Sequence, residues 1–195
     1  ALIISLLPRA GEVGHAADAT KTAIFAGGCF WCMEAAFDEV PGVTETVSGY
    51  AGGTKPNPNY GDHEGYQEAV RVSYDPAKVS YQQLLKTFWE DHDPTQGFRQ
   101  GNDIGTQYRS IILTTDDEQQ RIAEMSRDAY QAMLSAAGYG EIKTEIRPAG
   151  PFYYAEDYHQ QYLDKVVNSN RYASHRGANA YCPIHATGVK LPEGF

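Results

Sequence analysis

The 195-residue chain lacks several features that would assign it to a class at once. It has three cysteines, which cannot all pair within one chain, so a scaffold held together by disulfides is not expected. It has no cluster of Lys and Arg, and its formal net charge of −9 argues against nucleic acid and an anionic membrane surface as partners. No apolar run reaches the roughly 18 residues of a membrane-spanning helix. Small molecules and proteins remain as partners.

Large aliphatic side chains are also scarce. Leu, Ile, Val and Phe together make up fewer than a fifth of the chain, which, with the net charge, is a composition that hints at disorder. The 14 Tyr and two Trp residues answer this hint, because their rings bury large areas and also require hydrogen-bond partners. The sequence therefore predicts a folded chain whose core or active site is rich in hydroxyl groups.

The first 20 residues differ from the rest of the chain. They begin with a short apolar stretch and end in the small-residue pattern Ala17-Asp18-Ala19, which resembles the end of a secretory signal, although no basic segment precedes it. Residues 1–20 are thus either a flexible tail or a signal remnant, and the protein is expected in the cytoplasm or, in the second case, exported to the periplasm. From Lys21 onward no linker or repeat interrupts the chain, so residues 21–195 are predicted to form one domain.

Hydrophobic periodicity predicts alternating strands and helices. The expected strands cover 22–26, 43–50, 68–74, 107–115 and 142–147, and the expected helices cover 30–40, 80–92 and 115–138. The first six elements follow the order strand, helix, strand, strand, helix, strand. This order predicts an α+β fold, a ferredoxin-like split βαβ sandwich with a mostly antiparallel sheet and long functional loops.

This topology brings distant residues together. The first strand is expected between the third and the fourth, antiparallel to both, so that its end adjoins their beginnings. Cys29 follows the first strand, and Glu68 opens the third after a Gly- and Pro-rich loop that carries Tyr60. Asp103 and Tyr108 lie where the fourth strand begins. We expect these residues to meet at one edge of the sheet.

Cys29 is the strongest candidate for a reactive group. It follows a Gly-Gly pair at a predicted helix start, where unpaired N–H groups and the helix dipole favour a thiolate over an inert buried thiol. If the reaction expels an oxygen, a general acid accelerates it by about 10²–10⁴-fold. Glu68 is the candidate acid, provided that burial keeps it protonated. Tyr60 and Tyr108 are candidate hydroxyl donors to a developing oxyanion.

Five stretches of the chain resemble one known family. They are GCFWC at 28–32, SGYAGGTKPNPNY at 48–60, EAVRVSYDP at 68–76, FWEDHDPTQGFRQGNDIGTQYRS at 88–110 and PFYYAEDYHQQYL at 151–163. They are similar to the motifs of the A-type peptide methionine sulfoxide reductases and follow the family's order from about Lys21 to Leu191. The resemblance implies an oxidoreductase, a peptide-methionine (S)-S-oxide reductase, that repairs oxidised proteins by reducing methionine S-sulfoxide, free or in peptides and proteins, to methionine.

The resemblance also implies a role for each candidate site residue. Cys29 would attack the sulfoxide sulfur and become a sulfenic acid, while Glu68 delivers the proton. Hydrogen bonds to the sulfoxide oxygen would come from Tyr60, Asp103 and Tyr108. A pocket for the methyl group of the substrate would be formed by Phe30, Trp31 and Tyr162. Cys182 would then attack the sulfenic acid and convert it into a disulfide. Thioredoxin would reduce that disulfide, with no bound cofactor or metal, and a monomer is expected.

Two departures from the pattern of the family concern the cysteines, and a third places Tyr66 where a histidine is common. Some members carry a second C-terminal cysteine where this chain has Lys190, so a disulfide relay by that route is closed. Many members have glycine where this chain has Cys32. Cys32 could intercept the sulfenic acid or exchange a disulfide with Cys182, but its place on a helix three residues from Cys29 favours a bystander.

The cysteine spacing leaves two other functions open. A thioredoxin-like dithiol oxidoreductase would pair Cys29 with Cys32, and a disulfide between these two would favour it. A structural zinc site would use four ligands, Cys29, Cys32, Cys182 and His185. We expect no stoichiometric zinc. The remaining histidines, His92 and His159 included, are interpreted as helix-end or surface residues, and residues 155–162 as a helix with a solvated polar face.

Overall fold

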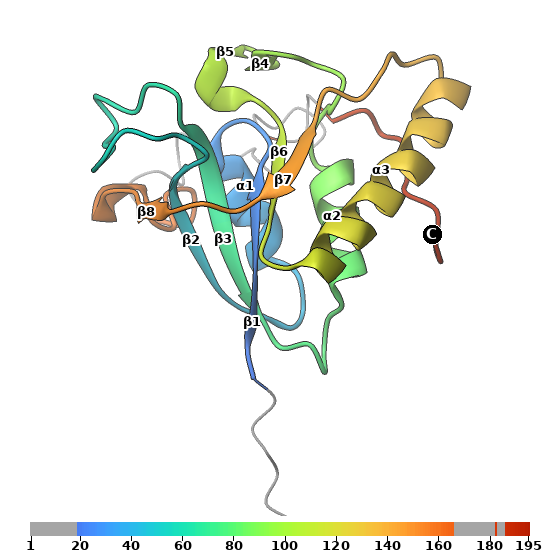
Figure 1. The fold of residues 1–195 in the computed structure, drawn as a ribbon, viewed down its shortest axis with the longest axis horizontal. Coiled ribbons are helices and arrows are strands. Elements are labelled where there is room, and N and C mark those ends of the chain that lie inside the picture. The colour runs from blue at the N-terminus through green and yellow to red at the C-terminus, as the bar shows by residue number, and fades with distance from the viewer. Residues whose placement is uncertain (1–18, 166–181, 183–185) are drawn as a thin grey trace, which may run out of the picture.

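A six-stranded sheet of order β7-β6-β1-β3-β2-β8 forms the centre of the structure (Figure 1), a computed structural model that describes residues 19–165, 182 and 186–195. Its strands are β1 (Lys21–Ala26), β2 (Val43–Ala51), β3 (Gln67–Tyr74), β6 (Ile111–Thr114), β7 (Glu145–Pro148) and β8 (Phe152–Tyr154). The pairing of β6 with β7 is parallel, and the other pairings of this sheet are antiparallel. The mixed fold with a mostly antiparallel sheet is therefore confirmed.

Three α-helices accompany this sheet in the part of the chain that the structure describes. They are α1 (Phe30–Asp38), α2 (Tyr81–Glu90) and α3 (Asp117–Ala136). The predicted capping box of α2 is present, since the Gln83 N–H donates to Ser80 Oγ at 3.1 Å and the Ser80 N–H donates to Gln83 Oε1 at 2.8 Å. Helix α3 begins later than predicted because Asp116, and not Thr115, is its N-cap and accepts the Gln119 N–H at 2.7 Å.

Aromatic rings fill the core, as the composition predicts. Phe25 on β1 stacks on Phe37 of α1 at 4.9 Å and on Phe88 of α2 at 5.3 Å. Trp89 is fully buried, and its indole N–H donates to Ser126 Oγ on α3 at 2.9 Å. Rings that bury a large area and still satisfy their polar atoms compensate for the few aliphatic side chains.

The region before β6 differs from its prediction. A single strand was expected over 107–115, but residues Thr106–Tyr108 form a 3-10 turn (η1) and the strand is Ile111–Thr114. A short hairpin of β4 (Arg99–Gln100) and β5 (Asp103–Ile104) precedes the turn. The turn η1 contacts β3, so Tyr108 lies beside the sheet instead of within a strand.

The two ends of the chain are described to different extents. The predicted tail or signal remnant at 1–20 lies outside the described residues except for its last two positions. Residues 186–195, which we call the C-terminal strap, return beside α3 (Figure 1), where Tyr130 Oη donates to the Val189 carbonyl at 3.0 Å. Within the described part of the chain, no helix has the length and apolar character needed to cross a membrane.

Candidate active site

Cys29 lies where β1 passes into α1, at the sheet edge that the topology predicts. Ala26 at the end of β1 pairs with Ile111 at the beginning of β6, and Phe25 pairs with Val70 near the beginning of β3. Cys29 is the N-cap residue of α1, and its thiol is free and only 9% exposed. The end of one strand and the beginnings of two others therefore surround a single buried sulfur.

Gly28 makes the tight turn into this position. Its φ of +100° lies in the left-handed region, which favours glycine. A Cβ at Gly28 would lie 2.7 Å from the Cβ of Gln100, whose amide is held by Asp93: the Asp93 N–H donates to Gln100 Oε1 and Gln100 Nε2 donates to the Asp93 carbonyl, both at 2.9 Å. The backbone before the thiol is thus packed against the β4–β5 hairpin with no room for a side chain.

The surroundings of Cys29 hold its proton in place. Burial raises the pKa of the Cys29 thiol well above its usual value, and the carboxyl groups of Glu68 and Asp103 raise it further. The backbone N–H groups of Trp31 and Cys32 lower it, as expected at a helix start, but burial and the acidic neighbours outweigh them. The prediction of a stabilised thiolate is therefore wrong for this site, where the sulfur is a thiol.

Glu68 is the buried carboxyl of the site. It is 3% exposed, and the Phe30 N–H donates to its Oε2 at 3.1 Å. Burial raises the pKa of Glu68 to about 8; the Phe30 N–H opposes this increase and the charge of Asp103 adds to it. A carboxyl group with this pKa is mostly protonated at pH 7, which is the state that a general acid requires. Its catalytic role stays a prediction.

Tyr60 and Tyr108 border the same group of residues from opposite loops. Burial raises the pKa of both phenols, and the charges of Glu68 and Cys29 raise them further, which shows that both rings lie near these groups. Asp103 also acts on Tyr108. The structure thus brings Tyr60, Tyr108 and Asp103 to the thiol, and both hydroxyls keep the proton that hydrogen-bond donation needs. Their roles likewise stay predictions.

The three aromatic residues expected to hold a methyl group form one cluster. Trp31 stacks on Tyr162 with a centroid distance of 3.8 Å and an angle of 8° between the rings. Phe30, which is 1% exposed, lies 6.4 Å from Trp31 by the same measure. Residues from α1 and from the segment after η2 (Asp157–His159) therefore make one aromatic wall beside the thiol.

Sequence reasoning missed the role of His159. His92 and His159 were interpreted as helix-end or surface residues; His92 does lie at the end of α2, although it is buried, whereas His159 is buried within the aromatic cluster of the site, and each is 1% exposed. His159 Nδ1 accepts the indole N–H of Trp31 at 3.0 Å, and its ring lies between those of Phe30 and Tyr60, at 5.0 and 4.5 Å. Residues 155–162 contain only the short 3-10 turn η2 and no solvated helix. The family-like motif around His159 was the one signal of this role.

Glu156 is a second residue that the sequence did not single out. Its Oε1 accepts the Tyr60 N–H at 2.8 Å, and its Oε2 accepts the hydroxyl of the buried Tyr50 at 2.9 Å. Glu156 therefore ties the loop that carries Tyr60 to the segment that carries His159.

The interpretation of Cys32 as a bystander is wrong. Cys32 forms a disulfide with Cys182, 150 residues away, with the two Cα atoms 5.3 Å apart. Helix α1 leaves the Cys32 side chain partly exposed, so the returning chain can reach it. The pairing that a thioredoxin-like enzyme would use, Cys29 with Cys32, is not the one observed.

The disulfide also bears on the zinc alternative, because it occupies two of the four proposed ligands. His185 lies outside the described residues. Among the residues that are described, no group of three or more His, Cys, Asp and Glu side chains is arranged to hold a metal ion.

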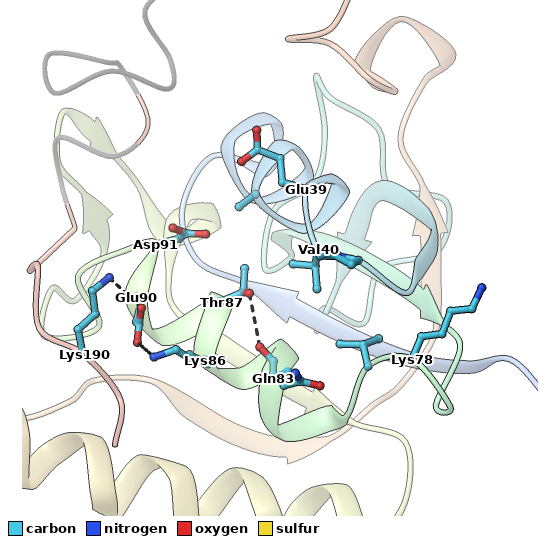
Figure 2. Close-up of a pocket in the computed structure, with 12 residues that line it drawn as sticks. Glu39, Val40, Lys78, Gln83, Lys86, Thr87, Glu90, Asp91 and Lys190 are labelled. Atoms are coloured by element: carbon cyan, nitrogen blue, oxygen red, sulfur yellow. Dashed lines mark hydrogen bonds and ion pairs between the residues drawn. The ribbon is translucent and has the colours of Figure 1, made fainter. Parts of the chain in front are cut away.

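A groove between the end of α1, α2 and the strap lies apart from this site (Figure 2). Its charged lining includes Glu39, Lys78 and Glu90, and none of the candidate site residues lines it. Glu90 accepts from Lys190 Nζ at 2.9 Å and from the Leu191 N–H at 3.0 Å, and it also pairs with Lys86. Glu90 therefore fastens the strap to α2.

The fold and the chemistry of the site place the protein among thiol-dependent oxidoreductases. Its reactive groups are one thiol and one disulfide at an edge of a mixed α/β fold. A family model described as peptide methionine sulfoxide reductase matches residues 21–185. The chain belongs to this family, as its motifs indicate.

Individual relatives agree with this assignment. The peptide methionine sulfoxide reductase MsrA of Rhodospirillum centenum is 55% identical over 176 residues, which span 88% of this chain and 75% of the relative. The methionine sulfoxide reductase A of Corynebacterium diphtheriae aligns with a TM-score of 0.72 at 43% identity, over 92% of this chain and 85% of that one. Mxr1 of Saccharomyces cerevisiae, solved in complex with Trx2, shares the fold with a TM-score of 0.52 at 24% identity, over 77% of this chain and 90% of its own.

Proposed function

We propose that this protein reduces the S epimer of methionine sulfoxide, free or in peptides and proteins, to methionine, and that thioredoxin regenerates it. One observation carries the proposal: a free, buried thiol, Cys29, lies beside a buried carboxyl, Glu68, whose pKa is raised to about 8 by burial. Membership of the peptide methionine sulfoxide reductase family supports the choice of substrate.

The first step balances without a cofactor. The Cys29 sulfur attacks the sulfoxide sulfur while Glu68 donates its proton to the sulfoxide oxygen, and the proton of the thiol returns to Glu68. The S–O bond of the substrate breaks as the S–S bond to Cys29 forms; that S–S bond then breaks as the hydroxyl oxygen adds to the Cys29 sulfur, and its electron pair leaves with methionine. Cys29, oxidised by two electrons, is then a sulfenic acid. Protons are moved but none is consumed.

The high pKa of Cys29 is compatible with this step. Protonation of the sulfoxide oxygen places positive charge on the sulfur that Cys29 attacks, and a cation this close favours the thiolate. Tyr60 and Tyr108 retain their protons and donate hydrogen bonds to the same oxygen. The site therefore activates its nucleophile when the substrate is present.

The aromatic cluster accounts for recognition of the methyl group. The methyl carbon next to a protonated sulfoxide carries partial positive charge, which the faces of Trp31 and Tyr162 attract. These two rings stack at 3.8 Å, and the buried ring of Phe30 lies behind them, 6.4 Å from that of Trp31. The cluster therefore binds the methyl group already in the substrate complex, so its loss is expected to appear mainly in KM.

Resolution of the sulfenic acid uses Cys182. Its thiol attacks Cys29, water leaves, and a disulfide forms that the dithiol of thioredoxin reduces with two electrons and two protons. The complex of the related Mxr1 with Trx2 supports this choice of reductant. We also propose that residues 21–195 form a monomeric catalytic domain that needs no bound cofactor. Its core would be a ferredoxin-like split βαβ sandwich. The compartment would be the cytoplasm or, if residues 1–20 are a signal remnant, the periplasm.

Methionine release without reductant tests the proposed function. The reduced protein, mixed with methionine S-sulfoxide, should release methionine in an amount set by the number of chains, and the R epimer should give none. Cys29→Ser should release no methionine, and Glu68→Gln should bind the sulfoxide but react slowly. Release of methionine by Cys29→Ser would refute the assignment of the nucleophile.

A further inference from the structure

The disulfide of the structure does not contain the nucleophile. Cys182, which the proposed function assigns to the attack on Cys29, is bonded to Cys32, and Cys29 is a free thiol. In this oxidised state the two-electron oxidation from one turnover is stored in the Cys32–Cys182 disulfide, while the nucleophile Cys29 is reduced and can react again.

We propose, on the basis of the proposed function, that Cys32 is a further catalytic residue, which transfers the disulfide from Cys29–Cys182 to Cys32–Cys182 before thioredoxin acts. The Cys32 thiolate attacks the sulfur of Cys182, the bond between Cys182 and Cys29 breaks, and Cys29 leaves as a thiolate. One disulfide replaces another, so no electrons are gained or lost.

The geometry of α1 permits this exchange. The carbonyl of Cys29 accepts the N–H of Cys32 at 3.2 Å and that of Met33 at 3.3 Å, so Cys29 and Cys32 are held at the spacing of one helical turn. Side chains three residues apart on a helix are neighbours, with Cβ atoms about 5–6 Å apart. A third sulfur can therefore bond to either cysteine after a short movement.

The C-terminal strap tethers Cys182 near α1. Five residues beyond Cys182, Thr187 accepts the Tyr139 hydroxyl through its carbonyl at 3.0 Å, and the next contacts fasten Val189 to Tyr130. Glu90 accepts the Leu191 N–H at 3.0 Å and Lys190 Nζ at 2.9 Å, the second of which Figure 2 shows. The five residues from Cys182 to Thr187 span at most about 17 Å, so the anchored strap tethers Cys182 near α1 in either disulfide.

Glu68 assists the departure of Cys29. A leaving thiolate in this buried site needs a proton, because burial and the neighbouring carboxyl groups disfavour its charge. The carboxyl of Glu68 is protonated at pH 7 and is a stronger acid than the Cys29 thiol, so the transfer of its proton to the departing sulfur is favourable. Solvent then restores the proton of Glu68.

Accessibility explains what the exchange achieves. Cys29 is only 9% exposed, whereas Cys32 and Cys182 are both partly exposed. A protein reductant has to bring its own thiolate into contact with a disulfide sulfur. Moving the bond from Cys29 to Cys32 therefore presents it to thioredoxin and frees the active site.

Counting methionine in the absence of reductant tests the exchange. The wild-type protein should release about two methionines per chain, the first before the exchange and the second from the freed Cys29. Cys32→Ser should release about one and stop as Cys29–Cys182, which peptide mapping detects. The first methionine reports on the proposed function and the second on the exchange, so the two proposals fail separately.

Three results would overturn the exchange: a second methionine from Cys32→Ser, a single methionine from the wild type, or a Cys29–Cys32 disulfide in Cys182→Ser. Cys182→Ser should instead release one methionine and carry a dimedone-reactive sulfenic acid on Cys29. The first methionine from Cys32→Ser also shows that this variant is folded.

A different observation supports a second inference, about His159. Its Nδ1 accepts the indole N–H of Trp31 at 3.0 Å, and it is 1% exposed. Burial lowers the pKa of His159, so the ring is neutral and Nδ1 is free to accept. We infer that His159 is a positioning residue that fixes the plane of Trp31 against Tyr162 and so shapes the methyl pocket.

Steady-state kinetics of two variants test this inference. His159→Ala removes the acceptor and should raise KM for methionine sulfoxide about 5- to 10-fold, the loss expected for one buried hydrogen bond, with a smaller change in kcat. His159→Asn offers an amide oxygen to the same indole N–H and should restore most of KM. An unchanged KM in His159→Ala, or equal losses in both variants, would exclude a positioning role.

Discussion

Replacement of Glu68 by glutamine should make the protein more stable and less active, and the size of the first effect follows from the structure. A glutamate titrates near its ordinary pKa of 4.5 in the unfolded chain and at about 8 in the fold. Between these values the folded state holds a proton that the unfolded state has lost, so folding stability falls as the pH rises through this window. From pH 5 to pH 9 the loss amounts to about 4 kcal/mol.

Glu68→Gln should lack this loss, because the amide is neutral at every pH and its oxygen can still accept the Phe30 N–H that Oε2 accepts at 3.1 Å. Urea unfolding of the wild type and of the variant at pH 5 and pH 9 measures the effect. The difference in unfolding free energy should grow by several kcal/mol in favour of the variant. Over the same range the variant should release its first methionine about 10²–10⁴-fold more slowly.

A control separates this effect from a general change in charge. Glu64 is exposed in the loop before β3, and Glu64→Gln removes the same formal charge. Its difference from the wild type should stay nearly constant between the two pH values. If Glu68→Gln behaves like Glu64→Gln, Glu68 is ionised in the folded protein and cannot be the acid.

Three further predictions concern the turn, the oxygen site and the strap. Gly28→Ala should lower the unfolding free energy by about 1–3 kcal/mol in urea titrations, because φ is +100° and the new Cβ would meet Gln100 at 2.7 Å. Tyr108→Phe should lower kcat more than it raises KM, since the lost hydroxyl is expected to act on the transition state; the reverse pattern would assign Tyr108 to binding. Glu90→Ala should leave the rate of release of the first methionine unchanged and lower the rate of release of the second, as measured by quench-flow, because the variant frees Lys190 and Leu191. An equal decrease of both rates would contradict a role confined to the strap.

The order of elements was enough to predict where distant residues meet. A strand, a helix, two strands, a helix and a strand leave few ways of pairing, and they put β1 between β3 and β6 as observed. Cys29, Glu68 and Tyr108 converge for this reason alone. Convergence of the backbone is a property of topology, so it can be inferred without any knowledge of side-chain packing.

The electrostatics of the site could not be predicted in the same way. A helix start lowers the pKa of a thiol, and this local effect was visible in the sequence. The larger effects on Cys29 are burial and the charges of Glu68 and Asp103, which depend on how the folded chain packs around the sulfur. The same closure buries His159, whose sequence surroundings look polar.

The disulfide between Cys32 and Cys182 could not be predicted from the sequence for a related reason. Helical spacing shows that Cys32 is a neighbour of Cys29, but the approach of a segment 150 residues away depends on where the strap docks. That docking rests on single contacts such as Glu90 with Lys190, which have no periodic signature.

The two departures from the family pattern that concern the cysteines are connected through this strap. Where some members carry a second C-terminal cysteine, Lys190 binds Glu90 at 2.9 Å and anchors the chain (Figure 2), so no thiol is available at that position. Cys32 supplies the missing thiol from α1, one turn from Cys29. Among relatives we therefore expect cysteine at the position of Cys32 where the second C-terminal cysteine is absent, and glycine there where it is present. Aligning relatives at these two positions checks the expectation, and independent variation of the two would contradict it.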